Sequence, residues 1–436
     1  MTRTGPKPLS LHLSMASLAA AGFAGGAAFS QEDLEGFFKG IQKYQAHPFK
    51  RSMPPLETVW QAGSVRLLRV EVEGQGGAPD AAARHAAAEI GGGIDDIGIK
   101  GDALADADAD ADAQVQAQAQ AQALAADAST VPPAKPAANA DATITPRRHK
   151  TSGIPVIVIP SMINGSAILD LLPDRSFVRF LAGQGLEVYL LDWGEAAKDP
   201  GLSSFDTAMR ERLLPALDAA GAEVMLLGYC MGGLFAAAAS VLRPNKVKGL
   251  VMLAAPWNFH DSEAALKNRI SVMKPAALPY MAQHGRLPES WVQAVFATLD
   301  PEGSIRKFAA FAALPERDKK AELFVAVEDW LNEGGALPAA MARSCMEEWY
   351  ERNLPHNGEW LVCGEVIAAE NVACPALVVA AKEDKIVPLE SALSFGDKAG
   401  TERILCATGH IGLMVSRDAA AAIWAPVARW LAAQQR

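Results

Sequence analysis

The chain has few cysteines, no excess of basic over acidic residues and no long apolar run after its first 30 residues. Each of these absences excludes some classes of protein. Its five cysteines are scattered over 436 residues without a CxxC pair. We therefore expect no disulfide framework, no metal centre and a reducing, cytoplasmic compartment. The net charge of −10 argues against a nucleic-acid partner, which requires a basic surface. No apolar run beyond Ser30 approaches the roughly 18 residues of a membrane span, so we expect no transmembrane segment.

Residues 74–149 lack aromatic side chains and hold few large aliphatic ones. They contain Gly91-Gly92-Gly93, an Ala-Asp alternation and an Ala-Gln alternation. Such a composition cannot bury enough apolar surface to offset the entropy of ordering the chain. We predict a disordered insertion here, without a function of its own; an interaction arm is the alternative.

The first 50 residues predict a helical N-terminal leader, with one helix over residues 31–50. Met1–Ser30 combines a basic start, Arg3 and Lys7, with an Ala-rich run that His12 interrupts. A cleaved secretory signal is the alternative for this stretch. Residues 51–73 then read as the first strands of a core, over 58–61 and 64–72.

The remaining sequence alternates buried strands with helical stretches, which predicts a mostly parallel sheet covered on both faces. We divide it into a core part over 150–256, a helical cap over 257–350 and a second core part over 351–436. A helix is expected from Pro173 to Gln184, closed by Gly185. The strands are expected at 155–160, 187–192, 224–227, 248–255, 375–381 and 403–407. Four tryptophans of the cap are expected mainly to pack it onto the core, although some could line an acyl tunnel: Trp257, Trp291, Trp330 and Trp349.

A strand, a sharp turn and a helix meet at Gly228-Tyr229-Cys230-Met231-Gly232. This is the frame of a nucleophile elbow, with cysteine in the place of serine. Gly228 and Gly232 would let the backbone turn tightly, and the dipole of the following helix would favour a thiolate at Cys230. The alternative is a buried cysteine in a Gly-rich turn.

Two further residues complete the order nucleophile, acid, histidine that an α/β-hydrolase triad requires. Asp384 follows the predicted strand 375–381, and His410 lies between Gly409 and Ile411 after the strand 403–407. We predict that Asp384 and His410 hydrogen-bond and that the other ring nitrogen of His410 faces Cys230. The competitor for the acid role is Glu383.

With these motifs the sequence resembles the polyhydroxyalkanoate synthases over about residues 154–433. The most specific segments are 168–176, 190–194, 228–233 and 409–412. The resemblance implies an α/β-hydrolase fold, and the length of the core is similar to that of the short synthases that work with a second subunit. It also places one oxyanion-hole donor at the backbone N–H of Ile163, beside that of Met231, which the elbow geometry predicts. Asn164 could be a turn residue or a substrate contact.

The implied reaction is polymerisation of 3-hydroxyacyl-CoA through a cysteinyl thioester, with release of CoA. Its substrate is itself a CoA thioester, and we expect no cofactor. The implied partners are a second synthase subunit or a homodimer, and the surface of a polymer granule. Two alternatives remain at this stage: a cysteine-dependent thioesterase, esterase or depolymerase, and a catalytically idle granule-surface protein.

Overall fold

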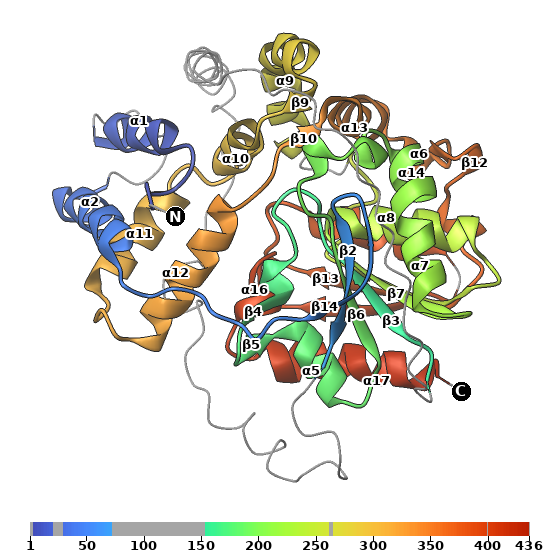
Figure 1. Cartoon of the computed structure of the whole chain (residues 1–436). Coiled ribbons are helices and arrows are strands. Elements are labelled where there is room, and N and C mark those ends of the chain that lie inside the picture. Colours follow the sequence, from blue (N-terminus) through green and yellow to red (C-terminus); the bar gives the residue numbers. More distant parts are fainter. Residues whose placement is uncertain (1–2, 21–28, 72–152, 261–264, 399, 436) are drawn as a thin grey trace.

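The computed structural model describes residues 3–20, 29–71, 153–260, 265–398 and 400–435. The prediction for residues 74–149 lies outside the described residues. At the centre is an eight-stranded sheet in the order β1-β2-β6-β3-β7-β8-β13-β14 (Figure 1). In this spatial order, the six strands from β6 to β14 are parallel to one another. At the other edge, β2 pairs antiparallel with β6, and β1 pairs antiparallel with β2. Their bounds are β1 Glu57–Ala62, β2 Val65–Val70, β3 Val156–Ile159, β6 Val188–Asp192, β7 Val224–Tyr229, β8 Val247–Leu253, β13 Ala376–Ala381 and β14 Glu402–Cys406.

Alternate residues of the strands feed two separate apolar layers. In β3, Ile157 and Ile159 belong to one cluster, and Val156 and Val158 to the other. This is the period-two pattern of a strand that is buried on both faces. Burial on both faces explains the nearly continuous apolar runs from which the parallel strands were predicted. The helices on the first side are α7 Leu214–Ala220, α8 Met231–Leu242 and α15 Leu389–Leu393; those on the second are α5 Phe177–Gly183, α16 Gly412–Val415 and α17 Ala425–Ala433.

The helix expected from Pro173 begins later than predicted. Residues 170–176 form a short hairpin of β4 Asp170–Leu172 and β5 Arg175–Ser176, and α5 begins at Phe177. The buried Asp170 carboxylate accepts hydrogen bonds from the Ser176 hydroxyl at 2.6 Å and from Arg179 at 2.8 Å. Ser176 also caps α5 by accepting from the Arg179 N–H. This polar cluster fixes the hairpin and moves the helix start.

We call residues 257–350, which lie between β8 and β13, the cap, and its described residues are mostly helical. Its elements, with the short ones that continue to β13, are α9 Ala265–His284, β9 Arg286–Leu287, α10 Glu289–Ala297, α11 Gly303–Ala313, α12 Lys319–Asn332, β10 Leu337–Pro338, α13 Ala339–Ser344, a π-helix Cys345–Glu351, α14 Leu354–Asn357, β11 Leu361–Val362 and β12 Glu365–Val366. Within the described part of the chain, no helix is long and apolar enough to cross a membrane.

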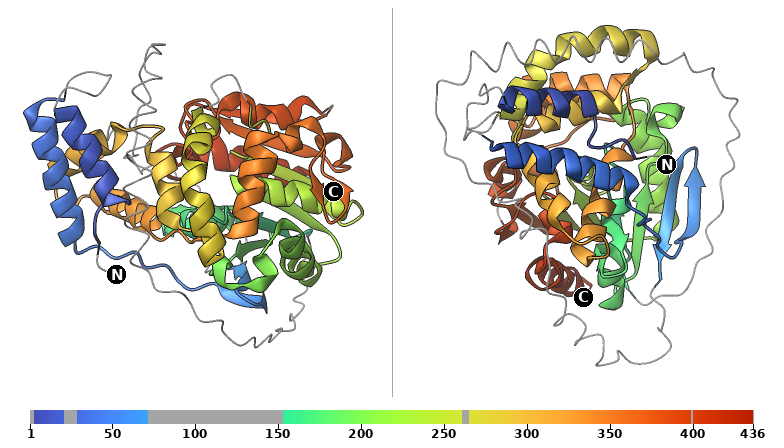
Figure 2. Two further views of the ribbon diagram at one scale, coloured as in Figure 1. Left: turned by 90° about the horizontal axis from the view of Figure 1, so that it is seen from above. Right: turned by 90° about the vertical axis from the view of Figure 1, so that its left-hand side faces the viewer.

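Two N-terminal helices, α1 Leu9–Ala20 and α2 Gln31–Ala46, lie beside α11 and outside the sheet (Figures 1 and 2). A separate aromatic cluster joins α2 to the cap, with Phe37 and Tyr44 packed edge-on to Phe308. Arg3 adds a two-pronged ion pair with Asp329 of α12, both contacts being 2.7 Å. The N-terminal helices are therefore attached to the cap rather than to the core.

Candidate active site

Cys230 stands alone between β7 and α8, in a backbone conformation that most side chains avoid. Its φ is 56° and its ψ is −128°, and its N–H donates to the Leu253 carbonyl at 2.9 Å. A non-glycine residue in such a region costs roughly 1–3 kcal/mol and persists only where the surroundings enforce it. The strand–turn–helix arrangement predicted for the elbow is confirmed by this geometry.

Three glycines make the turn sterically feasible. A Cβ at Gly228 would lie 2.5 Å from the Gly233 nitrogen, and one at Gly232 would lie 2.8 Å from the Pro160 carbonyl oxygen. A Cβ at Gly233 would overlap that of Ala255. Gly228 and Gly232 are thus required by close approach of the backbone, as predicted. Gly233 has the same requirement, because it lets α8 lie against the end of β8.

Asp384 and His410 meet at the carboxyl edge of the sheet, after β13 and β14. The Nδ1 atom of His410 lies 2.6 Å from Oδ2 of Asp384. The other carboxylate oxygen of Asp384 accepts from the N–H groups of Ile386 and Val387, at 2.9 and 2.8 Å. The predicted hydrogen bond is confirmed, and Glu383 is exposed. Because these contacts fix Asp384 on both oxygens, the orientation of the imidazole is also fixed.

The electrostatics of His410 couple it to Cys230. Burial alone would lower the pKa of His410, but the Asp384 carboxylate and the neighbouring Cys230 side chain together raise it well above its ordinary value. Since Nδ1 faces Asp384, Nε2 is the ring nitrogen that is left for Cys230. The Tyr229 hydroxyl donates to the His410 carbonyl at 3.3 Å and its ring packs against the imidazole. The structure thus brings the three predicted residues together.

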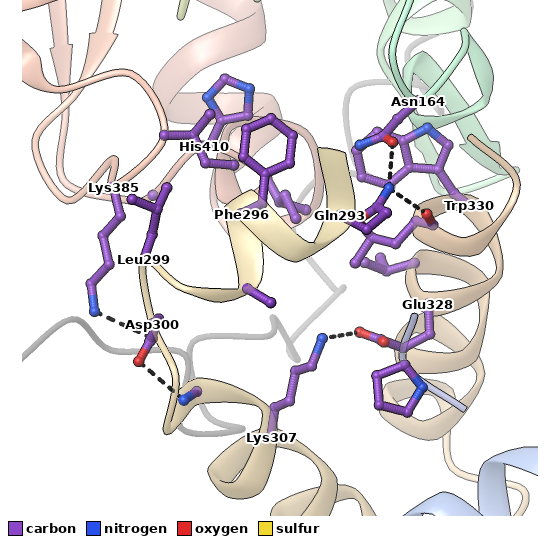
Figure 3. Close-up of a pocket in the computed structure, with 18 of the residues that line it drawn as sticks. Asn164, Gln293, Phe296, Leu299, Asp300, Lys307, Glu328, Trp330, Lys385 and His410 are labelled. Carbon is purple, nitrogen blue, oxygen red and sulfur yellow. Dashed lines mark hydrogen bonds and ion pairs between the residues drawn. The ribbon is translucent and has the colours of Figure 1, made fainter. Parts of the chain in front are cut away.

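A cavity of about 310 Å³ opens beside Cys230 and His410. Figure 3 shows His410 at one end of it, with Phe296 and Leu299 of the cap nearby. At the opposite end in this view lies the ion pair of Lys307 with Glu328, at 2.6 Å. The cavity therefore combines apolar side chains near His410 with ion pairs at its margins, Lys307–Glu328 and Lys385–Asp300. All four cap tryptophans are buried, and Trp330 alone among the four lines the cavity.

The loop after β3, Ser161–Asn164, carries the second predicted oxyanion donor, and we call it the oxyanion loop. Ile163 lines the cavity, but its N–H donates to the Ser161 hydroxyl at 3.2 Å. Met231 is the first residue of α8, so its N–H has no acceptor within the helix. Asn164 also lines the cavity, where its Oδ1 accepts from the Gln293 amide at 2.9 Å.

Sequence reasoning missed the contribution of the N-terminal segment to this cavity. Pro6, Lys7 and His12 line it, and the Nδ1 atom of His12 lies 2.8 Å from the Ser304 hydroxyl of α11. Burial, and then the charge of Lys307, lowers the pKa of His12 to about 4. The only signal was a histidine inside an otherwise apolar run. Nothing in the local sequence indicates that this run reaches the cap.

The described residues around the cavity form no evident metal-binding site. Among the residues that the structure describes, no group of three or more histidine, cysteine or carboxylate side chains could hold one. Cys374 and Cys406 are buried, as expected for small core residues, and burial raises the pKa of both thiols. The side chains that meet beside the cavity include a thiol, an imidazole and a carboxylate.

Comparison with known proteins gives both a fold and a group of relatives. A family model described as the alpha/beta hydrolase fold matches residues 154–416. Over 288 residues the chain is 31% identical to the poly(3-hydroxyalkanoate) polymerase subunit PhaC of Haloferax mediterranei, covering 64% of this chain and 58% of the relative. It is 26% identical over 288 residues to the PhaC subunit of Allochromatium vinosum, covering 64% and 80%.

The PhaC subunit of Haloarcula marismortui is 30% identical over 286 residues, covering 64% of this chain and 60% of the relative. The chain thus spans about 60% of the length of its Haloferax and Haloarcula relatives. Among solved structures, a monoacylglycerol lipase of Paleococcus ferrophilus is 16% identical with a TM-score of 0.39, covering 64% of this chain and 94% of the lipase.

Proposed function

The chain belongs to the α/β-hydrolase fold family, and from that premise we propose that it is an acyltransferase that polymerises 3-hydroxyacyl-CoA into polyhydroxyalkanoate. The observation that carries the proposal is Cys230 at a strained elbow beside His410, whose imidazole Asp384 holds through Nδ1. The substrate class is supported by the similarity to proteins named poly(3-hydroxyalkanoate) polymerase.

In the first half-reaction His410 takes the proton of Cys230, and Asp384 holds the tautomer and stabilises the imidazolium that forms. The thiolate attacks the thioester carbon, the C–S bond to CoA breaks, and His410 returns the proton to the leaving CoA thiolate. The amino end of α8 favours the negative charge on Cys230. The product is a cysteinyl thioester, which is close in energy to the substrate and remains activated for transfer.

The tetrahedral intermediate of this step carries a negative oxygen that requires donors. We assign one to the backbone N–H of Met231, where α8 begins. The second is the N–H of Ile163, which must exchange the Ser161 hydroxyl for the oxyanion. That exchange is favourable, because a charged acceptor forms the stronger hydrogen bond.

In the second half-reaction the hydroxyl of another 3-hydroxyacyl unit attacks the cysteinyl thioester, with His410 as base. An ester bond forms and the Cys230 sulfur leaves. Water would give hydrolysis at the same step, so the outcome depends on keeping water away from the intermediate. The apolar side chains of Phe296 and Leu299 near His410 suit that requirement.

The same proposal includes the partners. The Haloferax and Haloarcula relatives are named as polymerase subunits, and we propose that this chain likewise acts with a second subunit or as a homodimer, at the surface of a polymer granule. No bound cofactor is needed for the chemistry above, because the thioester bond supplies the activation.

Replacement of the nucleophile tests the proposed site. Cys230→Ala should release no CoA from 3-hydroxybutyryl-CoA, and Cys230→Ser should retain at most a trace of activity with an unchanged melting temperature. The wild-type protein, quenched in acid, should show one added 3-hydroxyacyl group on the peptide containing Cys230 by mass spectrometry. Undiminished CoA release by Cys230→Ala would refute the assignment.

A further inference from the structure

The cap holds the oxyanion loop directly, through contacts that come from two of its parts. The Nε2 atom of Gln293, on α10, donates to Oδ1 of Asn164 at 2.9 Å. The same amide nitrogen donates to the Leu331 carbonyl of α12 at 3.0 Å, which fixes Gln293 from the other side (Figure 3). The N–H of Gly335, just after α12, donates to the Ile163 carbonyl at 3.1 Å.

These contacts are partly buried and closely packed at Gly334. Gln293 is 8% exposed, so its amide hydrogen bonds are made out of bulk water. A Cβ at Gly334 would lie 2.9 Å from Oδ1 of Asn164 and 3.0 Å from the Ile163 carbonyl oxygen. The chain therefore lies close against the loop at Gly334, and a displacement of either segment there disturbs the other.

We propose that Gln293 is a positioning residue, which sets the place of the Ile163 N–H in the oxyanion hole by holding the side chain of Asn164. This inference rests on the proposed acyl-transfer chemistry at Cys230. Gln293 acts through the loop, because its amide nitrogen donates to two protein acceptors and one of them, Asn164, belongs to that loop. Turnover then requires that the cap, through Gln293, is correctly packed against the oxyanion loop.

The physical reason lies in the tolerance of an oxyanion hole. Donors act when they lie about 2.7–3.1 Å from the developing oxygen, and loss of one donor lowers kcat by about 10²–10³. The hydrogen bond from the Ile163 N–H to the Ser161 hydroxyl is long. The direction of this N–H therefore depends on the contacts that the cap makes with the loop at the Ile163 carbonyl and at Asn164. Without the Asn164 contact, the loop loses the side-chain anchor nearest to Ile163 and keeps its backbone contacts with Gly335 and Trp330.

The test compares Gln293→Leu, Asn164→Ala and the double variant in the full-length protein. CoA release from 3-hydroxybutyryl-CoA and hydrolysis of p-nitrophenyl butyrate are both measured. We expect each single variant to lower kcat at least tenfold with KM changed less than twofold. The double variant should be no slower than the slower single variant, because both changes remove the same contact. Gly334→Ala, which crowds the contact from the other side, should also lower kcat.

Matched controls are Gln42→Leu, on the exposed face of α2, and Gly183→Ala, where the added Cβ meets open space. Both should keep wild-type kcat and KM. An undiminished kcat in a folded Gln293→Leu protein, a change confined to KM, or multiplicative losses in the double variant would each overturn the inference. Gly334→Ala at full kcat would overturn it even if Gln293→Leu failed to fold.

The ester substrate separates this inference from the proposed function. If Cys230→Ala abolishes ester hydrolysis while Gln293→Leu leaves it unchanged, only the positioning role fails. If Cys230→Ala keeps full activity on both substrates, the site itself has been wrongly assigned, and the Gln293 effect then has no chemistry to act on.

Discussion

At the scale of single residues, the site depends on how Asp384 is held as much as on which residue it is. One carboxylate oxygen faces His410 and the other accepts two backbone N–H groups. The sequence predicted this pair from its order after two strands, and the geometry agrees. The hydrogen-bond partner of the Ile163 N–H could not be predicted from the sequence. Its bond to the Ser161 hydroxyl depends on the local conformation of the loop.

Asp384→Asn should lower kcat by about 10³–10⁴-fold while the fold survives, because an amide favours the wrong tautomer of His410. The pKa of His410 should also fall toward or below its ordinary value, since the charge of Asp384 is the largest contribution that raises it. Histidine NMR titration of both proteins measures the shift. A variant with near wild-type turnover would remove Asp384 from the proposed triad.

His12 should make the protein less stable in mild acid. Its pKa is lowered to about 4 in the folded state, so the unfolded chain binds more protons between pH 4 and its ordinary pKa of roughly 6.5. Stability is therefore full above pH 6.5 and falls as the pH drops through that window, by about 2–3 kcal/mol at pH 4.5.

Urea unfolding at pH 7.5 and pH 4.5, compared with His12→Gln, isolates this effect because the other titrating groups are shared. The difference in unfolding free energy between the two proteins should change with pH in that direction. An equal pH dependence in both proteins would mean that His12 is hydrated and not buried against Ser304.

At the scale of elements, local sequence predicted the helix α2 but not its partner. Its capping box, Ser30 with Asp33, and its apolar stripe are visible in the sequence. Its attachment to α11 depends on Gly40, where a Cβ would overlap the carbonyl oxygen of Phe308. A glycine inside a helix usually weakens it, and here it permits close packing. Such a contact joins residues far apart in the chain, which local patterns do not encode.

Gly40→Ala should therefore destabilise the protein by about 1–3 kcal/mol, as overpacking does, although alanine is the better helix former. Differential scanning fluorimetry should show a lower melting temperature. The matched control is Gly183→Ala, which meets open space at the end of α5 and should be neutral or stabilising by up to about 1 kcal/mol. Equal behaviour of the two variants would show that α2 does not pack on α11.

At the scale of the whole molecule, the pattern of apolar residues along the chain was enough to predict the strands of the central sheet. All eight strands of the sheet lie where the sequence pattern predicted them. The central parallel strands give the strongest pattern, because both of their faces are buried. The hairpin over 170–176 was missed, since a buried polar cluster around Asp170 decides it. The cavity wall was also missed, because residues from both ends of the chain and the cap meet there.

The central claim is acyl transfer from CoA to a growing chain, and product analysis tests it most directly. Purified protein is incubated with 3-hydroxybutyryl-CoA, free CoA is followed with a thiol reagent, and polymer and free 3-hydroxybutyric acid are quantified at the end. The account predicts that most of the released CoA is matched by ester-linked 3-hydroxybutyrate in polymer. Free acid equal to the released CoA, or no CoA release at all, would contradict it.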